Sequence, residues 1–434
     1  MESSKVQVME SCLVAPSEAT PTKGLWLSPL DLALADRGHT PLVFFYPSGD
    51  TFSNVARLKE GMAKALVLFY PFAGRLSVGD DGRVQITCNG EGALFVAASS
   101  CLVAADVDFT TPSPELRRVF VPRMEPSSLI FAAQVTFLKC GGVVLGVAVH
   151  HAAVDGPSTF HFMQTWSAFT RDGGAAVELP CHDRTLLRAR SPPVVHPGAL
   201  SVLCPKVTFS EASPPTATAA FTISGERLAA LKRLCGGAST FCSVSALLWR
   251  CASVARRLPP DATTRISFAV NIRRRRSLRP PLPARYFGNG LVLMAAAAAA
   301  REIASEALAS VADRIAGTLA RMDDEVARSS IDYLELEGAG RMGVRQLKGS
   351  MPETELRVVS WRGMQAYDAD FGCGAPAVLS RAESVRGGFA HVIDDGPTNQ
   401  RGGGDVRVVM CMEAVNMEKF ERLLYANITM ASRL

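Results

Sequence analysis

The sequence predicts a mixed fold of strands and helices, α/β or α+β, divided between two halves of similar composition. Apolar runs bounded by turn residues, which are typical of buried strands, occur in both halves, for example at residues 143–149 and 406–412. Other segments, for example 53–68 and 225–235, show the apolar spacing of amphipathic helices. The length of 434 residues favours two or three domains, because single cores stop growing near roughly 250 to 300 residues.

The composition is that of an ordinary globular protein, with 48% hydrophobic and 20% charged residues. The net charge of +5 is too mild to indicate nucleic-acid binding, although it suits a site for a phosphorylated ligand. The 11 cysteines include no Cys-x-x-Cys pair, which favours free thiols in a reducing compartment. The start has no apolar signal core, and no run reaches the roughly 18 apolar residues of a membrane span. We therefore expect a cytoplasmic protein that binds neither nucleic acid nor membrane.

The first half is predicted to begin with strands and to end on a hairpin. Period-two and apolar patterns predict strands at 5–13, 40–46, 83–87 and 93–98, a short turn or helix at 26–34, and a helix at 53–68. Two further strands, 132–138 and 143–149, flank Gly141-Gly142 and form a hairpin that leads into His150 and His151. Asp155, Gly156 and Pro157 then read as the cap and first turn of a helix.

The second half follows a stretch rich in Gly, Pro, Arg and His at 172–200, which reads as a crossing linker. Beyond it we expect strands at 221–223, 267–271, 358–361 and 406–412, and helices at 225–235, 240–258 and 417–425. After Leu291–Met294 and six alanines, the segment onward to Glu337 has the longest helical pattern. The alanine run itself is expected to be ordinary helix or strand–helix packing. We place an N-terminal domain at 1–175, a crossover linker at 176–205 and a C-terminal domain at 206–434.

His151 is the candidate catalytic residue. Histidine titrates near neutrality, so a positioned imidazole is the usual general base for an amine or hydroxyl nucleophile. A histidine at the end of a strand is, however, more often a satisfied core residue than a catalyst. His150 does not complete a metal site with it, because neighbouring residues of a strand point to opposite faces. We therefore expect no metal.

Other motifs carry little weight. Gly338–Gly343 fits G-x-G-x-x-G, but it follows a helix instead of a strand, so we interpret it as a loop. Asp370-Phe371-Gly372 spells the metal-binding triad of kinases without the other kinase motifs, and no G-x-S-x-G serine elbow occurs. Arg273–Arg276 is by itself a solvated charge run.

Two motifs taken together resemble the BAHD family of plant acyl-CoA-dependent acyltransferases. H-x-x-x-D-G occurs as His151 to Gly156, and D-F-G-x-G occurs as Asp370 to Gly374. The resemblance spans nearly the whole chain, and further matches are Leu27–Asp31, His39–Pro41, Tyr70–Arg75, Tyr286–Asn289 and Arg321–Asp324.

The resemblance implies two similar-sized chloramphenicol-acetyltransferase-like domains, each a mixed sheet flanked by helices, with a channel between them. Acyl-CoA would enter from one face as a co-substrate and the acceptor from the other, with no permanently bound cofactor. His151 would deprotonate the acceptor in the channel, and no acyl-enzyme would form. The protein would act as a monomer on small-molecule substrates.

The resemblance also implies roles for the motif residues. Asp155, followed by Gly156, would pair with an arginine and shape the loop instead of completing a triad. Asp370, with Gly372 and Gly374, would hold an ion pair with Arg273 far from the chemistry. Contacts with CoA are expected from Ser239, Thr240 and the arginines near Arg273, because phosphates favour hydroxyl and arginine donors.

The acceptor pocket implied by the resemblance comprises His39, Thr40, Leu42, Phe44 and Cys373. Cys373 stands where the family has tryptophan. In relatives that acylate shikimate or quinate, an arginine two residues after Ser-Trp holds the acid; here that position is Gly363, and Arg362 points elsewhere. A pocket without its cation would disfavour a carboxylate.

The chain is most similar to the hydroxycinnamoyltransferases of the grass amine type. We therefore expect transfer of a hydroxycinnamoyl or benzoyl group to an aromatic amine such as tryptamine or tyramine. Alternatives are N-acylation of putrescine or agmatine, with a carboxylate from Asp368, Asp394 or Asp395, O-acylation of shikimate or quinate, and a non-catalytic binding protein. We further expect His151 in a tunnel open at both ends, lined by Leu42, Phe44 and Cys373.

Overall fold

The structure is a computed structural model. It describes residues 5–431 except 175, 205–208, 210–213, 274–276, 339–348, 385 and 398–403. Most of the G-x-G-x-x-G segment and three of the four consecutive arginines lie outside the described residues, so their predicted roles stay predictions.

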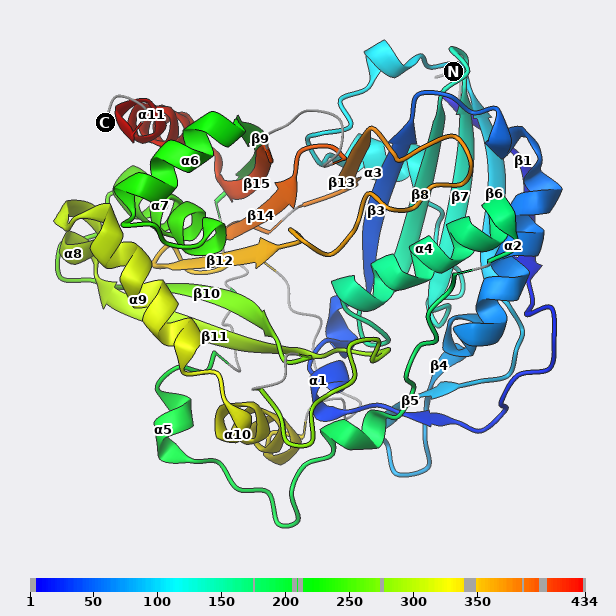
Figure 1. Ribbon diagram of the computed structural model, residues 1–434, viewed down its shortest axis with the longest axis horizontal. Helices are drawn as coiled ribbons and strands as arrows, with labels where there is room; N and C mark the ends of the chain where they lie inside the picture. The colour runs from blue at the N-terminus through cyan, green and yellow to red at the C-terminus, as the bar shows by residue number, and fades with distance from the viewer. Residues whose placement is uncertain are drawn as a thin grey trace.

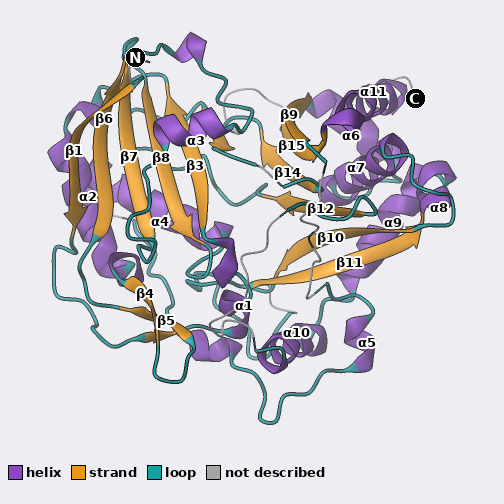
Figure 2. Cartoon of the chain, turned by 180° about the vertical axis from the view of Figure 1, so that it is seen from behind, coloured by secondary structure: helices purple, strands orange, loops and turns teal. Residues whose placement is uncertain are grey.

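Two six-stranded sheets organise the part of the chain that the structure describes, and they stand side by side in Figures 1 and 2. The first sheet has the order β1-β6-β7-β8-β3-β13. Its strands are β1 (Val6–Val14), β3 (His39–Tyr46), β6 (Ala93–Ser100), β7 (Phe131–Leu138), β8 (Val143–His150) and β13 (Val378–Arg381). Parallel pairing occurs only between β6 and β7 among these neighbours.

The second sheet has the order β11-β10-β12-β14-β15-β9. Its strands are β9 (Thr216–Ile223), β10 (Thr263–Asn271), β11 (Leu291–Ala299), β12 (Glu355–Ser360), β14 (Phe389–Asp394) and β15 (Val406–Glu413). The pairs β10–β12 and β12–β14 are parallel, so this sheet is mixed as well. A small third sheet joins β2 (Leu25–Trp26), β5 (Val84–Thr87) and β4 (Arg75–Val78).

Helices cover the sheets. The first sheet lies between α2 and α4 on one face and α3 on the other (Figures 1 and 2), and α6, α7, α9 and α11 flank the second sheet. The helices are α1 (Pro29–Leu32), α2 (Val55–Leu68), α3 (Pro114–Phe120), α4 (Gly156–Asp172), α5 (Pro197–Leu200), α6 (Gly225–Leu234), α7 (Thr240–Ala255), α8 (Ala300–Ser305), α9 (Leu308–Ala320), α10 (Asp324–Leu336) and α11 (Ala414–Ala431). Short 3-10 turns are Ala35–Arg37, Thr51–Ser53, Tyr70–Ala73, Ala104–Asp106 and Arg184–Leu187.

The predicted fold class of mixed sheets flanked by helices is confirmed. A separate hydrophobic core lies under each sheet, one around Phe72, Phe131 and Trp166 and the other around Trp249, Phe268 and Phe420. The segment from α4 to α5 crosses from one sheet toward the other along the lower edge of Figure 1. The domain boundaries at 175 and 206 stay a prediction, and β13 joins the first sheet from the second half of the sequence.

The alanine run, for which helix or strand–helix packing was expected, is mostly strand. Five of the six alanines, Ala295 to Ala299, continue the strand β11, and the remainder of the segment up to Glu337 forms three separate helices, α8, α9 and α10. Every residue of β11 pairs with β10, from Leu291 opposite Asn271 to Ala299 opposite Thr263. Backbone hydrogen bonds to the neighbouring strand therefore override the helical preference of alanine.

The sequence of β8 suits its position inside the first sheet. All its residues are buried between β7 and β3, as the continuous apolar run predicts. Gly146 lies where α3 ends, and a Cβ there would come within 1.8 Å of the carbonyl oxygen of Phe120. The close approach of α3 to this face therefore requires glycine.

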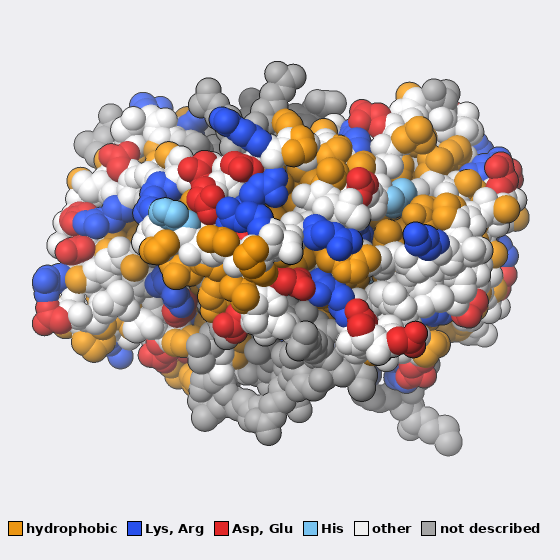
Figure 3. Space-filling view, turned by 90° about the horizontal axis from the view of Figure 1, so that it is seen from below, with side chains coloured by type: hydrophobic (Ala, Val, Ile, Leu, Met, Phe, Trp, Pro, Cys, Tyr) orange, Lys and Arg blue, Asp and Glu red, His pale blue; other side chains and the backbone are white. Residues whose placement is uncertain are grey.

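On the surface seen from below (Figure 3), basic, acidic and hydrophobic side chains are intermingled. None of the helices in the described ranges combines the length and the apolar character that a bilayer crossing demands.

Candidate active site

β8 delivers His151 to a cavity between the two sheets. The strand ends at His150, and the His151 backbone N–H donates to the Gly38 carbonyl, 2.9 Å away, which ties the loop to the start of β3. The cavity has a volume of about 720 Å³, and His151 lines it together with His39, Thr40 and Leu42. The structure thus brings the predicted base and three of the predicted pocket residues together.

His151 is a neutral imidazole at physiological pH. Burial, followed by repulsion from Arg37 and Arg381, lowers its pKa to about 4. Its Nδ1 is buried and has no hydrogen-bond partner within the described residues. A neutral ring next to a cavity can accept a proton, as a general base must.

His150 has a different environment. Its ring contacts the ring of His39 edge-on, with centroids 4.7 Å apart, and its Nδ1 accepts a hydrogen bond from the Ala152 N–H at 3.2 Å. Burial lowers its pKa to about 3. His150 is absent from the residues that line the cavity, as expected if neighbouring strand residues face opposite sides.

Asp155 is fully engaged away from His151. Its two carboxylate oxygens lie 2.8 and 3.0 Å from the guanidinium of Arg273, and they also accept from the N–H groups of Ser158 and Gly290. The side chains of Asp155 and Arg273 are 0% and 4% exposed. Asp155 therefore caps α4 and pairs with an arginine, as predicted, and does not form a triad with His151.

The predicted partner of Arg273 is wrong, and so is its predicted contact with CoA. Arg273 pairs with Asp155 instead of Asp370, and its remaining N–H groups donate to the carbonyls of Tyr286 and Gly288. These contacts leave no part of this buried guanidinium for a phosphate.

Asp370 has a local role. Its carboxylate accepts from the N–H groups of Gly372 and Gly374 at 2.7 and 2.8 Å, and it lies 3.7 Å from Arg171. Both glycines have positive φ, 106° and 88°, which explains the glycines of this motif.

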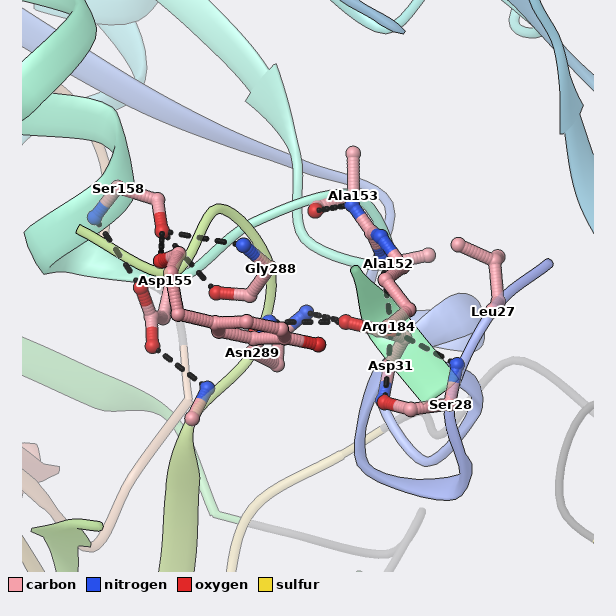
Figure 4. Close-up of polar contacts among 12 residues, drawn as sticks. Leu27, Ser28, Asp31, Ala152, Ala153, Asp155, Ser158, Arg184, Gly288 and Asn289 are labelled. Atoms are coloured by element: carbon pink, nitrogen blue, oxygen red, sulfur yellow. Dashed lines mark hydrogen bonds and ion pairs between the residues drawn. The ribbon is translucent and has the colours of Figure 1, made fainter. Parts of the chain in front are cut away.

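A second buried network, which the sequence did not reveal, holds the loop after His151 (Figure 4). The Asn289 Nδ2 donates to the His151 carbonyl and to Asp31 Oδ1, each at 2.9 Å. Arg184 pairs with Asp31 at 2.7 Å and donates to the Ala153 carbonyl at 2.7 Å. The signal in the sequence is the pair of segments Leu27–Asp31 and Tyr286–Asn289, which match the family but by themselves indicate no role.

Two predicted pocket residues do not line the cavity. Phe44 is completely buried in the core under the first sheet, and Cys373 packs against that core. Leu42 and Phe44 lie two residues apart and therefore face the same side of β3. The cavity lies at the start of this strand, whereas Phe44 pairs with Leu145 further along it, inside the core. Of the three residues that we expected in the tunnel wall, Leu42 lines the cavity, whereas Phe44 and Cys373 do not.

The expectation of a pocket without cations is also wrong. Arg362 does point elsewhere and pairs with Asp394 at 2.6 Å, as the sequence suggested. Nevertheless, six arginines line the cavity, from positions that sequence reasoning did not single out: Arg37, Arg117, Arg118, Arg123, Arg381 and Arg386. Asp368, Asp394 and Asp395, the candidate carboxylates for a polyamine, are not part of its lining.

Ser239 and Thr240 lie at the start of α7. The Ser239 hydroxyl caps this helix by accepting from the Cys242 N–H at 3.2 Å. Neither residue lines the cavity around His151, and their contact with CoA stays a prediction.

Known proteins resemble this chain over nearly its whole length. The Transferase family model matches residues 4–426. The chain is 40% identical to putrescine hydroxycinnamoyltransferase 1 of Oryza sativa subsp. japonica, covering 97% of this chain and 98% of that protein. It is 37% identical to shikimate O-hydroxycinnamoyltransferase of Nicotiana tabacum, with 97% and 99% covered.

A relative that acts on an aromatic amine is also similar. The chain is 36% identical to a hydroxycinnamoyl-CoA:5-hydroxyanthranilate N-hydroxycinnamoyltransferase of Avena sativa, covering 96% of this chain and 99% of that protein. Among solved structures, vinorine synthase superposes with a TM-score of 0.74 at 25% identity, covering 95% of this chain and 96% of that one. The extent of these matches, together with the geometry around His151, shows that the chain belongs to the transferase family of BAHD acyltransferases.

Proposed function

We propose that the protein transfers a hydroxycinnamoyl or benzoyl group from CoA to an aromatic amine and forms an amide. The observation that carries this proposal is the position of His151: a neutral imidazole at the end of β8, lining a cavity large enough for a small acceptor. The walls of the cavity include Pro41, Leu42, Trp361 and Phe389, which suit an aromatic ring.

In the proposed reaction the acyl group passes directly from CoA to the amine, without an acyl-enzyme. The amine nitrogen attacks the thioester carbonyl carbon, the C–N bond forms and the C–S bond breaks. His151 takes the proton released by the amine and returns it to the CoA thiolate, so that amide and free CoA leave. Asp155 and Arg273 take no part in the proton transfer, and they hold the loop on which His151 sits.

The positive charge of the cavity affects the protonation state in which an amine acceptor binds. The surrounding arginines disfavour a bound ammonium, so an amine is expected to bind in its neutral, nucleophilic form. For the same reason the cavity is a poor place for the diammonium form of putrescine, although one relative is named for that acceptor. Tryptamine and tyramine are the simplest aromatic amines of the proposed class.

O-acylation of shikimate or quinate is the second candidate. The specific observation in its favour is the set of arginines in the cavity, because both acceptors carry a carboxylate. A relative at 37% identity carries the shikimate name.

The test is an incubation with coumaroyl-CoA or benzoyl-CoA and a panel of acceptors, followed by product analysis by mass spectrometry. The panel contains tryptamine, tyramine, 2-aminobenzoate, putrescine, agmatine, shikimate and quinate. Amide products from the aromatic amines support the proposal. An ester of shikimate or quinate as the main product would select the second candidate, and no release of CoA with any acceptor would favour a non-catalytic binding protein.

The role of His151 is tested separately. His151→Ala is expected to lower kcat by about 10²- to 10⁴-fold. His196→Ala is the matched control, because His196 is an exposed histidine in the linker region. Turnover at the wild-type rate in His151→Ala would refute the assignment of the base.

A further inference from the structure

The cavity around His151 holds more positive charge than its own carboxylates can compensate. Asp155 and Glu383 are the acidic residues in the described part of its lining, and both are already paired. Asp155 pairs with Arg273, and Glu383 pairs with Arg117.

Three of the lining arginines, Arg37, Arg381 and Arg386, form what we call the arginine cluster. None of them has an ion-pair partner among the described side chains. Arg381 donates to the Glu383 carbonyl at 3.2 Å, and Arg386 lies over the ring of Phe209, 5.2 Å from its centroid.

Burial and mutual repulsion disfavour the charged forms of the arginines in this cluster. Burial and repulsion from Arg357, Arg386 and Arg381 lower the pKa of Arg37 to about 9. Burial also lowers the pKa of Arg381 to about 10; Glu383 opposes this shift, and Arg386 and Arg117 add to it. Like charges gathered in a half-buried cavity are unfavourable unless an anion compensates them.

We propose that the arginine cluster binds a carboxylate on the acceptor, so that the preferred acceptor carries an acidic group beside its aromatic or alicyclic ring. This inference rests on the proposed function and deepens it. Among aromatic amines it favours an aromatic amino acid or an aminobenzoate over the decarboxylated amine. Arginine suits this task, because its planar fork matches the two oxygens of a carboxylate.

The arrangement couples recognition to chemistry. Arg37 and Arg381 are also the groups that, after burial, lower the pKa of His151. A carboxylate that neutralises them therefore raises the pKa of His151 and makes the ring a stronger base once the correct acceptor is in place.

Phosphate oxygens of CoA share the chemistry of a carboxylate, and kinetics separates the two sources. If the cluster binds the acceptor, its loss raises the KM for the acceptor. If it binds CoA, its loss raises the KM for acyl-CoA instead.

The experiment compares pairs of acceptors that differ by one carboxylate: tryptophan with tryptamine, tyrosine with tyramine, and 2-aminobenzoate with aniline. For each pair we measure the ratio of kcat/KM with and without the carboxylate, at saturating acyl-CoA. The variants are Arg37→Gln, Arg381→Gln and Arg386→Gln. Arg301→Gln is the matched control, because Arg301 is 59% exposed on α8 and does not line the cavity.

We expect the wild type to prefer the carboxylated member of at least one pair, and the cluster variants to lower that ratio at least tenfold while Arg301→Gln keeps it. A preference for every decarboxylated amine, a ratio unchanged in the variants, or a rise confined to the KM for acyl-CoA would overturn the inference.

A binding measurement keeps the test independent of turnover and of variant folding. Indole-3-propionate carries the ring and the carboxylate but no amine, and indole-3-propionamide is its uncharged control. We expect the acid to bind to the wild type by calorimetry at least tenfold more tightly than the amide. Equal binding would contradict the inference. Tight binding of the acid without turnover of any amine would refute the proposed function and leave the carboxylate site standing.

Discussion

Asp155 and Arg273 form a bidentate ion pair, with N–O distances of 2.8 and 3.0 Å, that joins the start of α4 to the loop after β10. The pair belongs to the two different halves of the sequence and is buried between them. The carboxylate four residues after the proposed base therefore serves the architecture of the site, since it is bonded to Arg273 and accepts no hydrogen bond from the His151 Nδ1.

Breaking this pair is expected to destabilise the protein. Arg273→Ala leaves the Asp155 carboxylate buried without its cation, which costs about 3–5 kcal/mol. The expected result is a lower thermal midpoint and a lower kcat. Arg171→Ala is the control, because Arg171 is 41% exposed and lies 3.7 Å from Asp370, and its midpoint is expected to stay close to that of the wild type. Equal loss of stability in both variants would contradict the structural role of the pair.

The pH dependence of kcat is expected to follow His151. Burial and the two neighbouring arginines hold its pKa at about 4, so activity with 2-aminobenzoate is expected to remain constant down to the region of pH 5. Arg37→Gln removes part of the repulsion that opposes protonation, so the acidic limb of the profile moves to higher pH. A shift toward lower pH in Arg37→Gln would show that His151 does not sense this arginine.

Stability is expected to fall on mild acidification. Burial lowers the pKa values of six of the seven histidines in the folded protein: His39, His150, His151, His161, His182 and His391. The unfolded chain binds protons at these positions near pH 6.5, whereas the folded protein does so only near pH 4 or lower for His151, His161 and His182. Their contribution is therefore complete above pH 6.5 and is lost as the pH falls toward 4. Thermal midpoints measured between pH 7.5 and 5 test this, and a midpoint that rises in this interval would contradict it.

The network around Asp31 predicts an unusually harmful isosteric change. Asn289→Asp places a second carboxylate where the amide now donates to Asp31 Oδ1 at 2.9 Å, in a completely buried place. The expected loss is about 3 kcal/mol or more, together with a fall in kcat, because the His151 carbonyl also loses its donor. Asn89→Asp is the matched control: Asn89 donates to Glu91 at 2.7 Å, but on the exposed surface, where the change is expected to stay within about 0.5 kcal/mol.

Replacement of glycine by alanine is expected to have opposite effects on stability at two positions, Gly146 and Gly317. Gly146→Ala is expected to destabilise by about 1–3 kcal/mol, because the new Cβ would meet the Phe120 carbonyl oxygen at 1.8 Å. Gly317→Ala on the exposed face of α9 meets nothing within 4 Å and is expected to stabilise by up to about 1 kcal/mol. Thermal or denaturant unfolding of the two variants distinguishes them, and destabilisation by Gly317→Ala would contradict the account.

Much of the fold was predictable because its signals are local. The continuous apolar run of β8, the turn at Gly141-Gly142 and the cap formed by Asp155 and Pro157 depend on neighbouring residues alone. The strand β11 was not predictable in this way, since its alanines favour a helix until β10 offers hydrogen-bond partners along their whole length. Long-range pairing of this kind leaves no periodic signal in the sequence.

In the candidate site, too, the features that depend on neighbouring residues were predictable, and those that depend on long-range contacts were not. The motif that contains His151 and Asp155 gave the proposed base and the carboxylate that pairs with an arginine, because both lie within six residues of one loop. The prediction that Arg273 pairs with Asp370 is wrong. Arg273 pairs with Asp155, and these two residues are brought together only when α4 docks against the loop after β10.

The sequence by itself determined the fold class, the family and the residue that can act as the base, since each depends on local pattern or on motifs in order. Only the tertiary structure decided the charge of the cavity that the base faces. Arg37 precedes β3, whereas Arg381 and Arg386 lie at and beyond the end of β13, and these segments meet because β13 pairs with β3. An electrostatic field is a sum over distances in space, and the order of residues along the chain does not contain those distances.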